Sequence, residues 1–265
     1  MSTSECKHDY KETGTYRVSL YGEVPAMYGY DNKNFVPMIR CLKAVLIPNG
    51  YISPLKYGQY MFFGCENLVS LGVGVIGENM KDCRSLCHMF DGAKIKQIPE
   101  NILYYCENLI DASYIFEACD IEYLPDNLFK SCTKLKYLNH AFHRCDYLKE
   151  IPENFFDNCP EIENIEKMFQ ACRRLETVPS SLFDKCGKIK DARFAFAGET
   201  VVGGYLRKQE SLTSDVPPLW ERSDLPYGGV TDIGSEKWYK GYATGCVNAS
   251  NFQDALSNGW AWELN

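Results

Sequence analysis

The stretch LPDNLFKSC, from Leu124 to Cys132, decides the fold because close copies of it follow twice. IPENFFDNC begins at Ile151 and VPSSLFDKC begins at Val178, so successive copies start 27 residues apart. Each copy joins an aliphatic residue, a proline, two polar residues, a hydrophobic pair and a cysteine. A cysteine kept at one phase of a repeated unit has either a chemical role or a packing role. The other residues of the unit help to decide between these two roles.

The repeat extends beyond these three copies. Prolines and cysteines of this first series recur every 26 or 27 residues, at Pro99, Pro125, Pro152 and Pro179 and at Cys106, Cys132, Cys159 and Cys186. A second cysteine series lies halfway between, with a phenylalanine three residues before each member, at Cys119, Cys145 and Cys172. The segments around Cys65 and Cys246 look like an earlier, degenerate copy and a terminal copy.

Each unit divides into two half-turns. The apolar residues before each proline are typical of a short strand, and the proline with the polar residues after it fits the first turn of a helix or 3-10 turn. Charged residues three positions before each proline alternate in sign from unit to unit, at Lys96, Glu122, Lys149 and Glu176. A second outward column lies four positions after each cysteine of the first series and also alternates in sign after its first member, at Ile110, Lys136, Glu163 and Lys190. Neighbours on adjacent strands prefer such alternation. One unit is too small to bury its own apolar face, so the units must stack.

We therefore predict an α/β-type repeat solenoid over residues 61–198: a right-handed, leucine-rich-repeat-like coil of short strands and single helical or 3-10 turns, mostly β and irregular. Residues 1–60 are predicted to form a β-rich N-terminal cap, because an open solenoid end exposes unpaired edges. Residues 199–265 are predicted to form a Gly- and Pro-rich excursion and a C-terminal cap, anchored by Trp220 and Trp238.

The cysteines are best interpreted as packing residues. Thirteen cysteines without a secretory signal favour reduced thiols, and a free cysteine is a small hydrophobe that fits a tight inward corner. Zinc is the alternative for two clusters: Cys83, Cys87 and His88, and His140, His143 and Cys145. Neither cluster has the CxxC spacing of a strong zinc site. We expect no metal, no cofactor and no catalytic residue.

Composition argues against several classes of function. Hydrophobic residues make up 45% of the 265-residue chain, as in globular proteins, and the formal net charge is −7. Because the sequence has no basic run, nucleic acid binding is disfavoured, and no apolar stretch is long enough to span a membrane. The first residues lack the apolar core of a signal peptide. We expect a chain that leaves the cell within a virion or stays in the cytoplasm.

The motifs AFHRCDYLKEIP, from Ala141 to Pro152, and MFQACRRLETVP, from Met168 to Pro179, resemble leucine-rich repeats of the BspA-like, Treponema-type family. The resemblance covers roughly residues 60–198. It departs from the family in length, because a second cysteine-bearing half-turn extends the unit to 26 or 27 residues. The resemblance implies the solenoid fold. It implies function only loosely, because such repeats occur in bacterial surface adhesins, in unicellular eukaryotes and in phage proteins.

These observations favour a non-enzymatic recognition or structural module. We favour a virion surface component of a phage (a fibre, decoration or attachment protein) that contacts a protein or a cell-surface glycan, other virion proteins or itself. The alternatives are an intracellular protein-interaction scaffold, a bacterial surface adhesin and, least favoured, an enzyme. The candidate binding residues are outward tyrosines, which recognition surfaces favour: Tyr104, Tyr105, Tyr123, Tyr137 and Tyr147. The competing interpretation is that these tyrosines are partly buried rims over the phenylalanine column.

Overall fold

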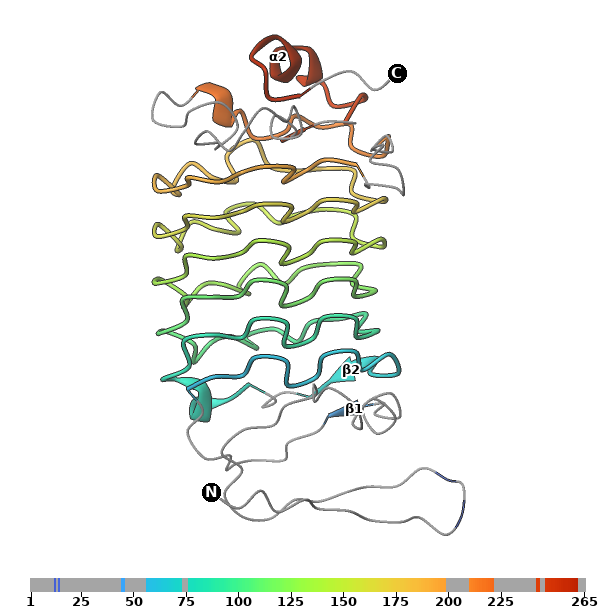
Figure 1. The fold of residues 1–265 in the computed structure, drawn as a ribbon, viewed down its shortest axis with the longest axis vertical. Helices are drawn as coiled ribbons and strands as arrows, with labels where there is room; N and C mark the ends of the chain where they lie inside the picture. The colour runs from blue at the N-terminus through green and yellow to red at the C-terminus, as the bar shows by residue number, and fades with distance from the viewer. Residues whose placement is uncertain are drawn as a thin grey trace, which may run out of the picture.

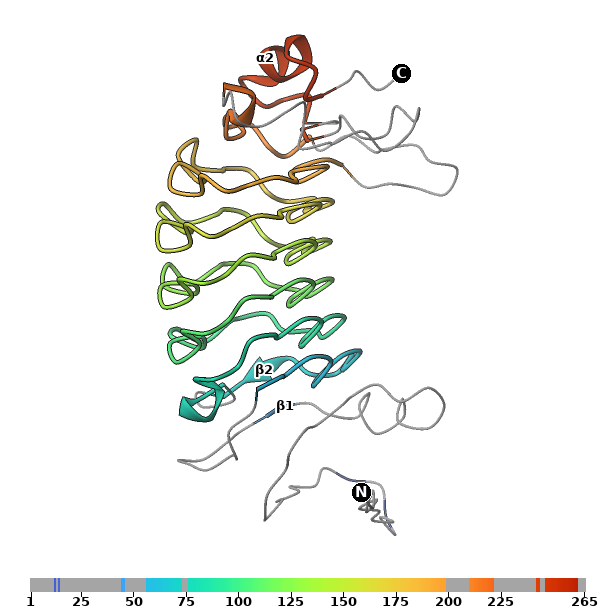
Figure 2. The same cartoon turned by 60° about the vertical axis from the view of Figure 1, so that its left-hand side comes forward.

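The chain winds into a coil of stacked turns with two long sides and looped ends (Figure 1; Figure 2). The computed structural model describes residues 12, 14, 44–45, 56–72, 76–198, 210–221, 242–243 and 246–261. The regular elements within them are β1 (Ala44–Val45), β2 (Ser70–Leu71), the 3-10 helices η1 (Glu78–Met80) and η2 (Leu219–Glu221), and α2 (Phe252–Ser257). Among the described residues, no helix has the length and apolar character needed to cross a membrane.

Adjacent turns of the coil, here called rungs, are joined by parallel backbone bridges in two columns. β1 and β2 start the parallel pairing, with Ala44 opposite Ser70. One column of single bridges then runs through Tyr57, Ser85, Asp111, Tyr137, Asn164 and Asp191, and a second contains the pairs Gln97–Tyr123 and Glu150–Thr177. After a first step of 28 residues from Tyr57 to Ser85, every bridge spans 26 or 27 residues, which confirms the register that the repeats predicted.

The expected short strands and helical turns are more irregular than predicted. Each strand segment of the repeats is reduced to a single bridge, because the chain enters a turn within a few residues. The segment after each proline forms consecutive hydrogen-bonded turns: the N–H of Ile102 donates to the carbonyl of Pro99 at 3.3 Å, and that of Cys106 donates to Leu103 at 2.9 Å. The solenoid therefore holds together by contacts between rungs more than by elements within one rung.

The turn at residues 112–119 shows how one rung is fixed to the next. The N–H groups of Tyr114, Phe116 and Ala118 donate to carbonyls of the following rung at 3.0, 3.0 and 2.8 Å. Tyr114 and Ala118 adopt left-handed backbone conformations, with φ of 59° and 53°, which cost free energy for residues other than glycine. The same conformation recurs one rung later at His140 and Arg144. The bonds between rungs offset this local cost.

Phenylalanine rings form a continuous buried column inside the coil. Neighbouring rings of the column stack with centroids 5.3–5.9 Å apart, through Phe62, Phe90, Phe116, Phe142, Phe169 and Phe196. A second buried column contains Phe129, Phe156 and Phe183, at 5.6 and 5.7 Å. Stacked aromatic pairs add to the free energy gained from burying their area, so each rung stabilises its neighbours.

The cysteines fill the corners beside these rings, which confirms the packing interpretation. The thiol of Cys145 donates to the carbonyl of Phe116 at 3.2 Å, and that of Cys172 donates to the carbonyl of Phe142 at 3.1 Å. The first series does the same more weakly, with Cys159 at 3.6 Å from the carbonyl of Phe129. All eleven cysteines that the structure describes are free thiols. We call the two series the cysteine ladder.

Charged residues on the outside follow the predicted alternation. Glu163 accepts hydrogen bonds from Lys136 of the preceding rung and from Lys190 of the following rung, both at 2.7 Å. These two lysines lower the pKa of Glu163 to about 2. In the other predicted column, the N–H of Glu122 donates to the carbonyl of Lys96. Exposed pairs of this kind contribute little energy each, but they confirm the register.

Residues after the last complete repeat continue the coil. The N–H of Phe196 donates to the carbonyl of Tyr242 at 2.9 Å, and the thiol of Cys246 donates to the carbonyl of Phe196 at 2.9 Å. Cys246 thus occupies a ladder position, which confirms the terminal copy. Residues 210–221 also contact the last complete repeat, because the N–H of Thr213 donates to the carbonyl of Glu176.

The division into an N-terminal cap, a solenoid and a C-terminal cap stays a prediction. The predicted β-rich cap lies outside the described residues, apart from residues 12, 14, 44–45 and 56–60. The predicted excursion is described only at residues 210–221, and the side chains of Trp220 and Trp238 lie outside the described part.

Because the thiols of the cysteine ladder are buried, we expect them to be unreactive in the folded protein. Burial raises the pKa of Cys65 to about 12 and raises the pKa of Cys145 and Cys172 as well. Because thiolate is the reactive species, a pKa of about 12 lowers the thiolate fraction of Cys65 about a thousandfold at neutral pH. Alkylation by iodoacetamide, followed by mass spectrometry of peptides, should be at least about a hundredfold slower in native protein than in denatured protein.

Candidate functional site

The five tyrosines predicted as binding residues are exposed, but they lie in three separate places. Tyr123 and Tyr147 lie near one another, because Lys149, two residues after Tyr147, contacts the ring of Tyr123. Tyr137 belongs to the other bridge column, and Tyr104 and Tyr105 lie in the turns that follow Pro99. Their exposed fractions run from 39% to 56%, which argues against the interpretation as buried rims. The structure therefore splits the predicted site into three surfaces.

Tyr123 and Tyr147 are each covered by a cation from the next rung. The Nζ atom of Lys149 lies 5.4 Å from the ring centroid of Tyr123 and donates to its hydroxyl at 3.3 Å. The guanidinium carbon of Arg174 lies 4.8 Å from the ring centroid of Tyr147. Tyr147 and Lys149 are two residues apart in one segment, so the two pairs are contiguous. We call these four residues the cation–tyrosine patch.

Tyr104 and Tyr105 line a hollow at one looped end of the coil. Their rings meet edge to face with centroids 5.1 Å apart. The hollow has a volume of about 440 Å³ and is also lined by residues of the preceding rung and of the turn after Pro99: Ile76, Gly77, Pro99, Glu100, Asn101 and Ile102. Within the part of the chain that the structure describes, no cation covers either of these two rings as Lys149 and Arg174 cover those of the cation–tyrosine patch.

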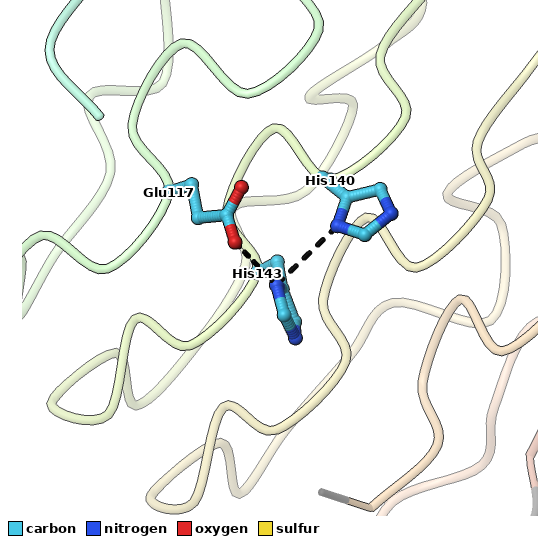
Figure 3. A group of neighbouring side chains, drawn as sticks. All are labelled: Glu117, His140 and His143. Atoms are coloured by element: carbon cyan, nitrogen blue, oxygen red, sulfur yellow. Dashed lines mark hydrogen bonds and ion pairs between the residues drawn. The ribbon is translucent and has the colours of Figure 1, made fainter. Parts of the chain in front are cut away.

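A second kind of site, not predicted from the sequence in this combination, joins two histidines and a carboxylate (Figure 3). The Nδ1 atom of His143 lies 2.8 Å from Oε1 of Glu117 and 3.3 Å from Nδ1 of His140. Glu117 and His143 occupy the same phase of successive rungs, 26 residues apart. This 26-residue spacing, equal to one repeat, is the feature of the sequence from which their contact could have been predicted. We call these three residues the His–Glu cluster.

The ring of His140 is held in a column of stacked rings. It stacks on Tyr114 with centroids 4.4 Å apart, Tyr114 stacks on His88 at 4.1 Å, and His88 stacks on Tyr60 at 4.7 Å. Burial, with the nearby charges of His143, Lys167 and His88, lowers the pKa of His140 to about 3. His140 is therefore neutral at physiological pH.

The two zinc clusters considered from the sequence do not form with the ligands that were named for them. In the first, Cys83 donates to the carbonyl of Ser85 at 3.3 Å, and Nδ1 of His88 pairs with Asp91 at 2.7 Å. In the second, Cys145 belongs to the cysteine ladder and points to a backbone carbonyl. The two histidines of the second cluster do meet, but their third partner is Glu117 and not the cysteine.

The stacked parallel rungs and the buried phases of leucine, phenylalanine and cysteine define a leucine-rich repeat solenoid. Comparison with protein families matches residues 40–159 and 113–212 to the BspA type leucine-rich repeat region, in six copies. These segments cover more than half of the chain, so the chain belongs to the BspA-type leucine-rich repeat family. No curated protein matches the chain.

Among solved structures, the chain is weakly similar to the following three. The LRIM1/APL1C complex is 14% identical, with a TM-score of 0.37 over 65% of this chain and 31% of that one. A leucine-rich cell surface protein from Faecalibacterium prausnitzii A2-165 is 15% identical, with a TM-score of 0.21 over 61% and 34%. A TLR13–ssRNA13 complex is 14% identical, with a TM-score of 0.22 over 80% and 31%.

This chain spans about a third of the length of each of those chains. Because all three TM-scores are low, the family assignment rests on the repeat match alone.

The lowered pKa of His140 predicts a loss of stability in mild acid. Between its unfolded pKa of about 6.5 and its folded pKa of about 3, the unfolded chain binds the proton and the folded chain does not. The free energy of unfolding should therefore fall as pH drops through this window. Urea denaturation of metal-free protein at pH 7 and pH 4.5 measures this fall, which His140→Tyr should reduce. An equal fall in both proteins would contradict the assignment.

Proposed function

We propose that this chain is a non-enzymatic recognition module that binds a protein partner through the cation–tyrosine patch. Membership of the BspA-type leucine-rich repeat family supports a protein-binding or surface-recognition role. The observation that carries the choice of surface is the contiguous arrangement of Tyr123, Tyr147, Lys149 and Arg174 over adjacent rungs. Tyrosine and arginine are enriched among the residues that dominate binding energies at protein interfaces.

The patch is suited to binding because its side chains are already ordered. Each tyrosine ring carries a cation within 5.4 Å of its centroid, and such contacts contribute about 0.5–1 kcal/mol at exposed sites. The backbone beneath belongs to the hydrogen-bonded rungs, where the N–H of Glu176 donates to the carbonyl of Lys149 at 2.8 Å. A preorganised surface loses less side-chain and backbone entropy on binding.

A protein partner fits the long side of the coil better than a small ligand does. The bridge column runs along this side and offers a rigid wall rather than an enclosed cavity, and protein interfaces are broad. The finer roles weighed from the sequence, a virion component as the favoured one and a bacterial surface adhesin or an intracellular scaffold as alternatives, stay predictions. Glycan binding and self-association are tested alongside protein binding.

The test is selection of binders from a displayed peptide library against the purified full chain. The double variant Tyr123→Ser, Tyr147→Ser should bind the selected peptides at least about tenfold more weakly, since tyrosines at interface centres contribute the most energy. Tyr137→Ser is the matched control, because Tyr137 is 40% exposed, against 39% for Tyr147, but belongs to the other bridge column.

Two results would contradict this proposal. One is a set of peptides that bind the double variant unchanged and lose affinity for the Tyr137 variant. The other is binding on a glycan array, or self-association in sedimentation, that depends on the patch while no peptide does.

A further inference from the structure

Three potential metal ligands converge where two rungs meet at the looped end formed by residues 112–119 and 139–145. Glu117 comes from one rung, and His140 and His143 come from the next (Figure 3). Their ligand atoms all lie within 4.8 Å of one another. The side chains of Glu117 and His143 are 19% and 17% exposed, so the cluster is packed into the coil but open to an ion from solvent.

The two contacts of Nδ1 of His143 compete for one hydrogen or one lone pair. If Nδ1 of His143 carries a hydrogen, it donates to Glu117 at 2.8 Å, and a bare Nδ1 of His140 at 3.3 Å receives at most a weaker share of the same hydrogen. If that Nδ1 is bare, it accepts from His140, and its lone pair then faces the carboxylate oxygen. A cation among the three atoms would accept all of their lone pairs together.

The distances fit a divalent transition metal. Zinc binds imidazole nitrogen at about 2.0–2.1 Å, so two nitrogens at a tetrahedral angle lie about 3.3 Å apart. The two Nδ1 atoms of His140 and His143 are 3.3 Å apart. The carboxylate oxygen, at 2.8 Å from Nδ1 of His143, reaches the same spacing with a small rotation of Glu117. Imidazole and carboxylate together are a ligand set that zinc favours.

The backbone holds both histidines before any ion binds. The N–H of His140 donates to the carbonyl of Glu166 at 2.8 Å, and the carbonyl of His143 accepts from Ala118 at 2.8 Å. The stacked ring of Tyr114 fixes the plane of the His140 ring. A site whose ligands are already oriented binds with little loss of conformational freedom.

Charge around the cluster also favours a cation. Asp91 belongs to the preceding rung at the same phase as Glu117, and its pKa is raised by burial first, with a contribution from the nearby carboxylate of Glu117. A cation on Glu117 would relieve this repulsion. The positive charge of Lys167, which lies at the phase of His140 one rung later, opposes cation binding. Its Nζ atom lies 3.8 Å from Oε1 of Glu166, whose negative charge partly compensates that of the lysine.

We propose that Glu117, His140 and His143 form a zinc-class metal site that links two adjacent rungs of the solenoid. Three protein ligands leave a fourth position for water or for a carboxylate of a bound partner. This inference goes beyond the proposed recognition role and does not rest on it, because the His–Glu cluster shares no residue with the cation–tyrosine patch.

The test uses the full chain, stripped with a chelator, in calorimetric titration with zinc chloride. One ion should bind per chain with micromolar affinity or tighter, and it should raise the melting temperature, since the three ligands are brought together only in the folded chain. Two variants borrow residues from neighbouring rungs and should still fold: His140→Tyr, as at Tyr114, and His143→Gln, as at Gln170. Each should weaken binding at least about tenfold, because even residues that merely orient metal ligands cost 10–100-fold.

The matched control is His88→Tyr, which removes a histidine from the same stacked column two rungs away and should leave zinc affinity unchanged. Cobalt(II) supplies a second readout: its visible spectrum should show nitrogen and oxygen ligation without a thiolate charge-transfer band. Zinc bound equally by all variants, a thiolate band, or no binding at millimolar zinc by the wild-type chain would each overturn the site. Circular dichroism of each variant separates loss of ligation from loss of fold.

Discussion

The structure depends on backbone hydrogen bonds that pass from one rung to the next through a left-handed turn. In the turn around Phe116, every second N–H points to the following rung, and the residues between them close the turn itself. Left-handed backbone is unfavourable for Tyr114 and Ala118, so the turn persists only because its neighbours complete it. That mutual dependence explains why the repeats must be stacked to fold.

The same constraint gives the cysteines their place. The carbonyl of Phe116 accepts the N–H of Cys119 within its own turn and the thiol of Cys145 from the next. A thiol is small enough for this corner and still a weak donor. The repeated cysteine therefore answers a packing need at each rung, while charge and aromatic character are free to vary on the outside.

Much of this architecture could be predicted from the sequence, because equal residues at equal phases pack alike. The phenylalanine column and the alternating charges around Glu163 follow from the spacing alone. The reduction of strands to single bridges could not be predicted, because it reflects where N–H groups find partners across rungs. The His–Glu cluster was missed because sequence pairs His140 and His143 with the nearby Cys145. Stacking turns that cysteine inward and brings in Glu117 from another rung.

The most direct test is native-state hydrogen exchange of the amides that join the rungs. If rung-to-rung bonding holds the fold, the N–H groups of Tyr114, Phe116 and Ala118 should exchange only through global unfolding, together with those of His140 and Phe142 one rung later. The same amides exchanging rapidly in the folded chain, or one rung opening independently of its neighbours, would contradict the account.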